Sequence, residues 1–207
     1  MADTYKSMTE LIRKHDKTSD YMFEVGYRNS DTLITAIHGG GIEAGTTELA
    51  LLTSELSNSN YFSFKGLKAS GNTQLHVTST NYDNPLLLTL NQNADKTIAI
   101  HGYSGTEKNT FVGGNDKQLV TLITQYLKEK GFCVEIAPTR ISASKETNIT
   151  NKNKRGVGVQ LELSTSLRKA LFEGSDFSKK NRESRNNWSE SMYEYANAIC
   201  KALQDVK

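Results

Sequence analysis

Two apolar runs of the sequence each end in a histidine that is followed by glycine. His38 follows "TLITAI" and precedes a glycine triplet and Glu43, whereas His101 follows "KTIAI". Imidazole nitrogens and carboxylate oxygens are ligands that zinc takes in hydrolytic sites, where three protein ligands leave one position open. The pattern therefore favours one zinc ion per chain, held by His38, Glu43 and His101.

The glycine-rich turn after His38 has two other chemical interpretations and one structural one. An esterase oxyanion hole also needs a G-x-S-x-G nucleophile turn, and the nearest match, "HGYSGTE", has the wrong spacing. A phosphate-binding loop is disfavoured because both common phosphate motifs are missing and Glu43 would repel the anion. A purely structural histidine at a strand end is the remaining alternative.

Two further residues compete for the ligand positions. Glu48 is a rival of Glu43, but its place in the first turn of a predicted helix favours an interaction with the helix dipole. His76 lies in "TQLHVTS", whose alternation predicts a strand with the histidine on one face. We interpret His76 as structural and keep it as the alternative third ligand.

A carboxylate that does not bind the metal is also needed, to carry a proton between water and the leaving nitrogen. In "VGVQLEL" the apolar residues share one face of a predicted strand, and Glu162 lies on the other face. A charged side chain there costs free energy unless it faces water or a site. Glu162 is therefore the predicted catalytic carboxylate, and a solvated edge strand is the alternative.

Residues 138–156 form a long polar segment that is rich in cations. Arginine in particular suits carboxylate ligands, so the segment indicates an anionic substrate. An ordinary solvated surface is the alternative. We expect Arg140, Lys154 and Arg155 to bind the substrate; Lys145 and Lys152 are the other cations of the segment.

Short apolar runs alternate with helical periodicity along the chain. This alternation predicts an α/β fold in which a mixed, mostly parallel sheet carries helices on both faces. Ligands of such sheets bind beyond the carboxyl ends of the strands, where His38 and His101 would meet. Because neither a linker nor a repeat interrupts the pattern, residues 1–207 are expected to form a single catalytic domain.

The bulk composition narrows the possible partners. A net charge of +2 over 207 residues argues against a nucleic-acid-binding protein. Neither a membrane-spanning run nor an apolar leader is visible, so we expect a protein made in the cytoplasm that binds no membrane. Cys133 and Cys200 are interpreted as small buried residues. A monomer is expected, because no coiled-coil seam is apparent.

The segments "IHGGGIEAGTTELA", "AIHGYSG" and "RGVGVQLELS" occur in this order. Together they closely resemble the poly-γ-glutamate hydrolases of bacteriophages and their bacterial relatives, over nearly the whole chain. The resemblance implies a fold related to zinc carboxypeptidases, with His38, Glu43 and His101 as ligands and Glu162 as the catalytic carboxylate. Those peptidases have His-x-x-Glu where this chain has His-x-x-x-x-Glu, so Glu48 stays the alternative carboxylate.

The resemblance also implies the substrate and the place of action. Poly-γ-glutamate is a capsule polymer with one free carboxylate per unit, which a basic loop would bind. A phage enzyme that degrades the capsule would be released by host lysis and would need no export signal. The alternatives are a zinc amidase that acts on peptidoglycan stem peptides, and a phage module that binds a polyanion without cleaving it.

Overall fold

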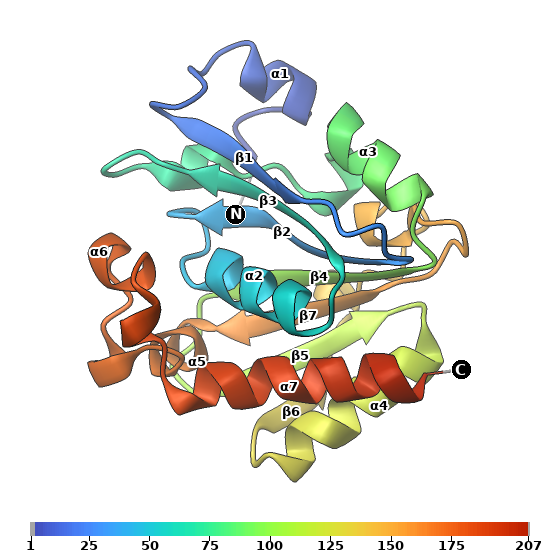
Figure 1. The fold of residues 1–207 in the computed structure, drawn as a ribbon. Helices are drawn as coiled ribbons and strands as arrows, with labels where there is room; N and C mark the ends of the chain where they lie inside the picture. The colour runs from blue at the N-terminus through green and yellow to red at the C-terminus, as the bar shows by residue number, and fades with distance from the viewer. Residues whose placement is uncertain (1–2, 207) are drawn as a thin grey trace.

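One twisted sheet runs through the computed structural model, which describes residues 3–206 (Figure 1). Its strand order is β1-β3-β2-β4-β7-β5-β6. Within the described residues, four of the six strand pairings are parallel, and β1–β3 and β5–β7 are antiparallel. The predicted mixed, mostly parallel sheet is confirmed. The strands are β1 (Tyr21–Gly26), β2 (Thr32–Gly40), β3 (Asn60–Gly66), β4 (Lys96–Tyr103), β5 (Asn109–Gly114), β6 (Cys133–Ile136) and β7 (Val159–Ser164).

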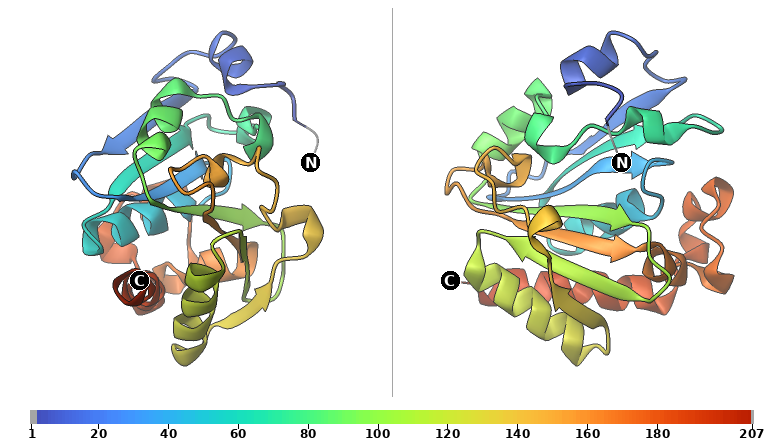
Figure 2. Two further views of the ribbon diagram at one scale, coloured as in Figure 1. Left: turned by 90° about the vertical axis from the view of Figure 1, so that its right-hand side faces the viewer. Right: turned by 180° about the vertical axis from the view of Figure 1, so that it is seen from behind.

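Helices cover both faces of this sheet, as predicted. Figure 2 places α1 and α3 on one side of the sheet, and α4 and α7 on the other. No helix within residues 3–206 combines the length and the apolarity that crossing a bilayer requires. The α-helices are α1 (Met8–Ile12), α2 (Thr46–Leu56), α3 (Pro85–Gln92), α4 (Lys117–Glu129), α5 (Thr165–Ala170), α6 (Lys179–Arg182) and α7 (Glu190–Asp205).

The central strand β2 shows how the sequence builds two cores. Leu33 and Ile37 point to the core under α1 and α3, and Ile34 and Ala36 point to the core under α2, α4 and α7. All of these side chains are fully buried. Successive residues of a strand face opposite sides, so a strand covered on both faces reads as a continuous apolar run.

Several helices begin where a polar side chain accepts a backbone N–H. The side chains of Asn84, Asp116 and Ser164 accept hydrogen bonds at the first turns of α3, α4 and α5. Such caps satisfy amide groups that have no partner inside the helix. The helix α2 has no side-chain cap at its start. It begins after Gly45, whose φ of 98° a side chain would strain.

Several parts of the chain differ from the sequence expectation. The segment "TQLHVTS" is not a strand: residues Asn72–Leu75 and Ser79–Asn81 form 3₁₀ turns, and His76 lies between them. The strands β1 and β5 were not predicted at all. Cys200 is buried as expected, but Cys133 is exposed at the start of the edge strand β6.

The sheet brings the predicted chemical residues to one edge. The strands β2, β4 and β7 lie side by side and run parallel, so His38 and His101 lie toward the carboxyl ends of neighbouring strands. His101 is also the register partner of Glu162 on β7. Parallel pairing therefore gathers at one place three side chains that are far apart in the sequence.

Candidate metal centre

A cavity of about 440 Å³ lies at this edge of the sheet. Five of the residues that line it carry imidazole or carboxylate groups. Two of the imidazoles come from the strands β2 and β4, and the third comes from the loop between the two 3₁₀ turns. The five residues are His38, Glu43, His76, His101 and Glu162.

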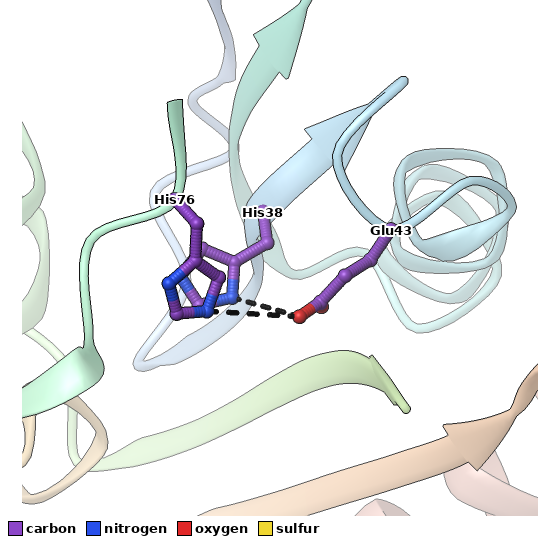
Figure 3. A group of neighbouring side chains, drawn as sticks. All are labelled: His38, Glu43 and His76. Atoms are coloured by element: carbon purple, nitrogen blue, oxygen red, sulfur yellow. Dashed lines mark ion pairs between the residues drawn. The ribbon is translucent and has the colours of Figure 1, made fainter. Parts of the chain in front are cut away.

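His38, Glu43 and His76 form a compact group of potential ligands (Figure 3). Their ligand atoms all lie within 4.8 Å of one another. Nδ1 of His38 is 3.2 Å from Oε1 of Glu43, and Nε2 of His76 is 4.0 Å from the same oxygen. Two ligand atoms of a tetrahedral zinc ion are about 3.3 Å apart, because each lies ~2.0–2.1 Å from the metal. The donor types and their spacing fit a zinc ion.

In both His38 and His76, the ring nitrogen that does not face Glu43 makes a hydrogen bond to another residue. Nε2 of His38 donates to the carbonyl oxygen of Val77 at 2.9 Å. Nδ1 of His76 lies 2.7 Å from Oδ1 of Asp3. Because a carbonyl and a carboxylate can only accept, each contact places a hydrogen on that nitrogen and turns the other nitrogen toward Glu43. This arrangement is typical of metal-binding histidines.

The predicted ligand His101 also belongs to this cluster. Its Nδ1 is 3.1 Å from Nδ1 of His38 and 3.7 Å from Oε2 of Glu43. Its Nε2 is buried and has no hydrogen-bond partner among the described residues. The structure thus brings together both imidazoles considered for the third position. Of His76 and His101, it is the His76 ring that makes the outer hydrogen bond typical of a metal-binding histidine, through Nδ1 to Asp3.

The glycine-rich turn allows Glu43 to fold back onto His38. A Cβ atom on Gly39 would lie 2.1 Å from Oγ1 of Thr47, so no side chain fits there. Gly40 has φ of 62°, and a Cβ atom there would lie 2.4 Å from the carbonyl oxygen of Gly66. These two positions need glycine because other backbone and side-chain atoms approach them closely. They explain the unusual sequence after His38.

The turn places Glu43 in a largely buried position, where a backbone N–H and imidazole rings surround its carboxylate. The backbone N–H of Gly102 donates to its Oε2 at 2.8 Å, and only 14% of its side chain is exposed. Burial raises the pKa of Glu43, but the neighbouring His38 and His101 and the Gly102 N–H outweigh burial and lower it to about 2. Burial lowers the pKa of His38, and the charge of Glu43 outweighs that effect and raises it.

Glu162 lies in the same cavity in a different environment. It is 7% exposed, and its Oε1 accepts one hydrogen bond from Nε2 of Gln160 at 2.8 Å. Burial, followed by the negative charge of Glu43, raises the pKa of Glu162 to about 8. The sequence placed Glu162 opposite the apolar face of its strand, and this placement is confirmed, because Leu161 and Leu163 point into the core.

Of the three cations expected to bind the substrate, the structure brings Arg140 to the cavity. Lys154 lies 3.6 Å from Asp95, and Arg155 lies 2.7 Å from Asp116. Neither is among the residues that line this cavity, and substrate binding by these two cations stays a prediction. Lys145, from the same segment, does line it.

Three charged residues, Glu48, Arg168 and Asp3, lie outside the lining of this cavity. Glu48, the alternative ligand, is paired with Arg182 at 3.2 Å and lines a different cavity. Arg168 is buried and donates to the carbonyl oxygens of Ala44, Tyr103 and Leu163, so it ties together the turn of Glu43 and the ends of β4 and β7. Sequence reasoning missed Arg168 and Asp3, because neither lies in a motif.

The raised pKa of Glu162 predicts a pH-dependent stability of the metal-free protein. Folding raises the pKa of Glu162 from its usual value of 4.5 to about 8, so the folded state binds more protons than the unfolded state between these pH values. Glu162 therefore lowers the free energy of unfolding as the pH rises through this window. Glu162→Gln cannot ionise, so it removes this loss of stability. Because one pKa unit corresponds to about 1.4 kcal/mol, the free energy of unfolding of Glu162→Gln at pH 8 should exceed that of the unchanged protein by roughly a few kcal/mol.

Urea unfolding of chelator-treated protein at a series of pH values measures this difference. The stability gain of Glu162→Gln should be small at pH 4.5 and grow toward pH 8. Glu173→Gln, which changes an exposed carboxylate outside the cavity, is the matched control. A gain for Glu162→Gln that does not vary with pH would contradict the assignment.

Comparisons with known proteins agree with this site. A sequence model of the poly-gamma-glutamate hydrolase family matches residues 5–198. The SPbeta prophage-derived protein YoqZ of Bacillus subtilis (strain 168) is 38% identical over 207 residues, which cover 99% of this chain and 73% of YoqZ. A solved bacteriophage poly-gamma-glutamate hydrolase is 38% identical with a TM-score of 0.95, and the match covers 99% of this chain and 98% of that one. A zinc-free, apo structure of YndL is 34% identical with a TM-score of 0.90, at the same coverage. The resemblance seen in the sequence is confirmed: the chain belongs to the poly-gamma-glutamate hydrolase family.

Proposed function

We propose that this protein is a zinc-dependent hydrolase that cleaves the γ-glutamyl amide bonds of poly-γ-glutamate. The observation that carries the proposal is the His38–Glu43–His76 cluster, which lies in one cavity with Glu162. Membership of the family supports the substrate. Action on capsule polymer after host lysis, as a monomer, belongs to the same proposal.

The cluster supports a single zinc ion held by His38, Glu43 and His76. Two imidazoles and one carboxylate leave a fourth position open for catalysis. Nδ1 of His38 lies 3.2 Å from Oε1 of Glu43, so one cation could bind both atoms. His101, the third ligand that the sequence predicted, would lie beside these three residues and is now the alternative to His76.

Arg140 and Lys145 line the same cavity and are both exposed. Poly-γ-glutamate carries a carboxylate on every unit, because its amide bonds use the side-chain carboxyl group. A guanidinium can hold such a carboxylate through two parallel hydrogen bonds. Arg140 therefore suits a carboxylate next to the amide bond that is cut.

Glu162 is the proposed proton carrier. Bound zinc would polarise the amide carbonyl and acidify a water molecule. Glu162 then takes a proton from the attacking water and delivers it to the departing nitrogen. A nearby cation also favours the ionised form of a carboxylate, so the raised pKa of Glu162 should fall when the metal is bound. The residue would then be a base near neutral pH.

Removal of the metal tests the proposal as a whole. Poly-γ-glutamate should shorten on a gel when it is incubated with untreated protein. Shortening should stop after treatment with a chelator and resume after zinc is restored. Polymer that stays intact under all three conditions would contradict the substrate, and release of material from purified peptidoglycan would then be the next measurement. Cleavage that persists in chelator would contradict the role of the metal.

Metal content distinguishes the two possible third ligands in the same series. His76→Ala should lose most of its bound zinc, because only two ligands remain, whereas His101→Ala should retain it. The opposite result would assign the third position to His101. Circular dichroism of both variants checks that a loss of zinc does not come from unfolding.

Glu162→Gln tests the proton carrier separately from the metal. The amide cannot take up a proton, so kcat should fall about 10²- to 10⁴-fold. Zinc content and fold should be unchanged, because Glu162 is not a proposed ligand. The measurement is the rate of amine release from a short γ-glutamyl oligomer, with zinc measured on the same preparation. Near-normal turnover by this variant would rule out the proposed base.

Arg140→Ala tests recognition of the anionic substrate. A hydrogen bond to a charged group contributes about 1.5–3 kcal/mol, so KM should rise roughly 10- to 100-fold with a smaller change in kcat. Lys128→Ala is the matched control, because it removes one exposed cation from the last turn of α4, away from the cavity. Equal effects of the two substitutions would indicate general charge attraction instead of a specific contact.

A further inference from the structure

The segment that precedes α1 reaches the metal centre from the far end of the chain. Oδ1 of Asp3 lies 2.7 Å from Nδ1 of His76, and Oδ2 of Asp3 accepts a hydrogen bond from the backbone N–H of Thr78 at 2.7 Å. Only 13% of the Asp3 side chain is exposed. One carboxylate thus holds both the His76 ring and the backbone two residues beyond it.

His76 needs such support more than the other histidines of the cluster. His38 and His101 lie on β2 and β4, where the sheet fixes their backbone. His76 lies in extended backbone between two 3₁₀ turns, and its N–H makes a turn hydrogen bond of 3.3 Å to Thr73. Its ring stacks on the His38 ring with 3.9 Å between centroids. Stacking limits the tilt of the His76 ring but does not determine which nitrogen faces Glu43.

The hydrogen bond to Asp3 determines which nitrogen of the His76 ring faces Glu43. A carboxylate accepts but does not donate, so it places the hydrogen of neutral His76 on Nδ1. Nε2 is then free of hydrogen, and this is the nitrogen that lies 4.0 Å from Oε1 of Glu43. Carboxylate partners of this kind orient metal-binding histidines and raise their basicity.

We propose that Asp3 is a positioning residue of the metal centre, which orients the His76 ring and holds its loop so that Nε2 faces the cation site. The inference rests on the proposed function, with His76 as a zinc ligand. It assigns a task to a segment in which the sequence shows no motif.

The segment around Asp3 is anchored independently of this contact. Met8 and Leu11 of α1 are fully buried in the same core as Leu75 and Val77, the two neighbours of His76. The N–H of Thr9 also donates to Oδ1 of Asp83 at 2.9 Å. The packing should therefore persist when Asp3 is replaced, so a substitution there reports on the carboxylate itself.

The test compares Asp3→Ala and Asp3→Asn with the unchanged protein by zinc competition against a chromogenic chelator at one pH. Loss of such an outer carboxylate weakens metal binding by about 10- to 100-fold, and this is the expectation for Asp3→Ala. Asparagine has a single acceptor oxygen for two N–H donors, so Asp3→Asn should lose less. Asp3→Asn also serves if the alanine variant does not fold.

Asp83→Asn is the matched control, because Asp83 binds the same N-terminal segment but does not contact His76. It should bind zinc with unchanged affinity even if the free energy of unfolding falls. The visible spectrum of cobalt-loaded protein, which reports the ligand geometry, should change in the Asp3 variants and not in Asp83→Asn.

His76→Ala separates the inference from the proposed function. If His76→Ala weakens zinc binding and Asp3→Ala does not, the ligand set stands and the role of Asp3 is overturned. If Asp3→Ala and Asp83→Asn weaken binding equally, the contact is merely structural and the inference is again overturned. If His76→Ala leaves the affinity unchanged, both the ligand set and the inference fail.

Discussion

The burial of the Glu43 carboxylate among imidazoles is the constraint on which the rest of the site depends. An ionised carboxylate that leaves water costs several kcal/mol unless donors or opposite charges replace its hydration. Here the N–H of Gly102 and the His38 ring supply part of that replacement. Glu43 can lie there only because Gly39 and Gly40 let the chain turn where side chains would collide. A cation between Glu43 and the imidazoles would complete the compensation.

Neighbouring strands and side chains fix the positions of the residues in this cluster. Parallel pairing of β2 with β4, and of β4 with β7, fixes the backbones of His38, His101 and Glu162. Buried Arg168 donates to the carbonyl oxygens of Ala44 in the turn, Tyr103 of β4 and Leu163 of β7, and so holds the turn of Glu43 against the ends of these two strands. A guanidinium suits this task, because its donors are arranged in a rigid planar fork. The loop of His76, which has no sheet to support it, is held by Asp3 instead.

Sequence reasoning predicted the parts of this arrangement that local pattern determines. Buried parallel strands appear as apolar runs, so β2, β4 and β7 could be found, and with them the convergence of His38, His101 and Glu162. The strands β1 and β5 were missed. Each makes an antiparallel pairing, and neither carries the uniformly apolar run of β2. The alternation around His76 suggested a strand, but tertiary packing of Leu75 and Val77 produces the same spacing in a loop. Contacts such as Asp3–His76 join residues that only the folded chain brings together.

Of the three cations predicted to bind the substrate, the structure places Arg140 in the lining of the cavity and Lys154 and Arg155 outside it. Lys154 and Arg155 are close in sequence to Glu162, but proximity in sequence does not determine which way a loop side chain points. Each finds a nearby carboxylate, Asp95 or Asp116, and an ion pair of this kind competes with any substrate for the same charge. Arg140 and Lys145 line the cavity and form no ion pair with another described residue. A count of positive charges in a loop therefore indicates the class of ligand but not the residues that bind it.

The two carboxylates of the cavity differ because their surroundings differ. Glu43 receives a backbone N–H and faces imidazoles, and its pKa falls to about 2, whereas Glu162 receives one side-chain amide, and burial raises its pKa to about 8. A metal ligand must stay ionised at all working pH values, whereas a proton carrier must be able to hold a proton. Environments that shift the pKa values of two neighbouring acids in opposite directions suit the two acids to different roles. This difference in hydrogen bonding arises from the positions of the turn after β2 and of the strand β7, and it supports the proposal that Glu43 binds the metal and Glu162 carries the proton.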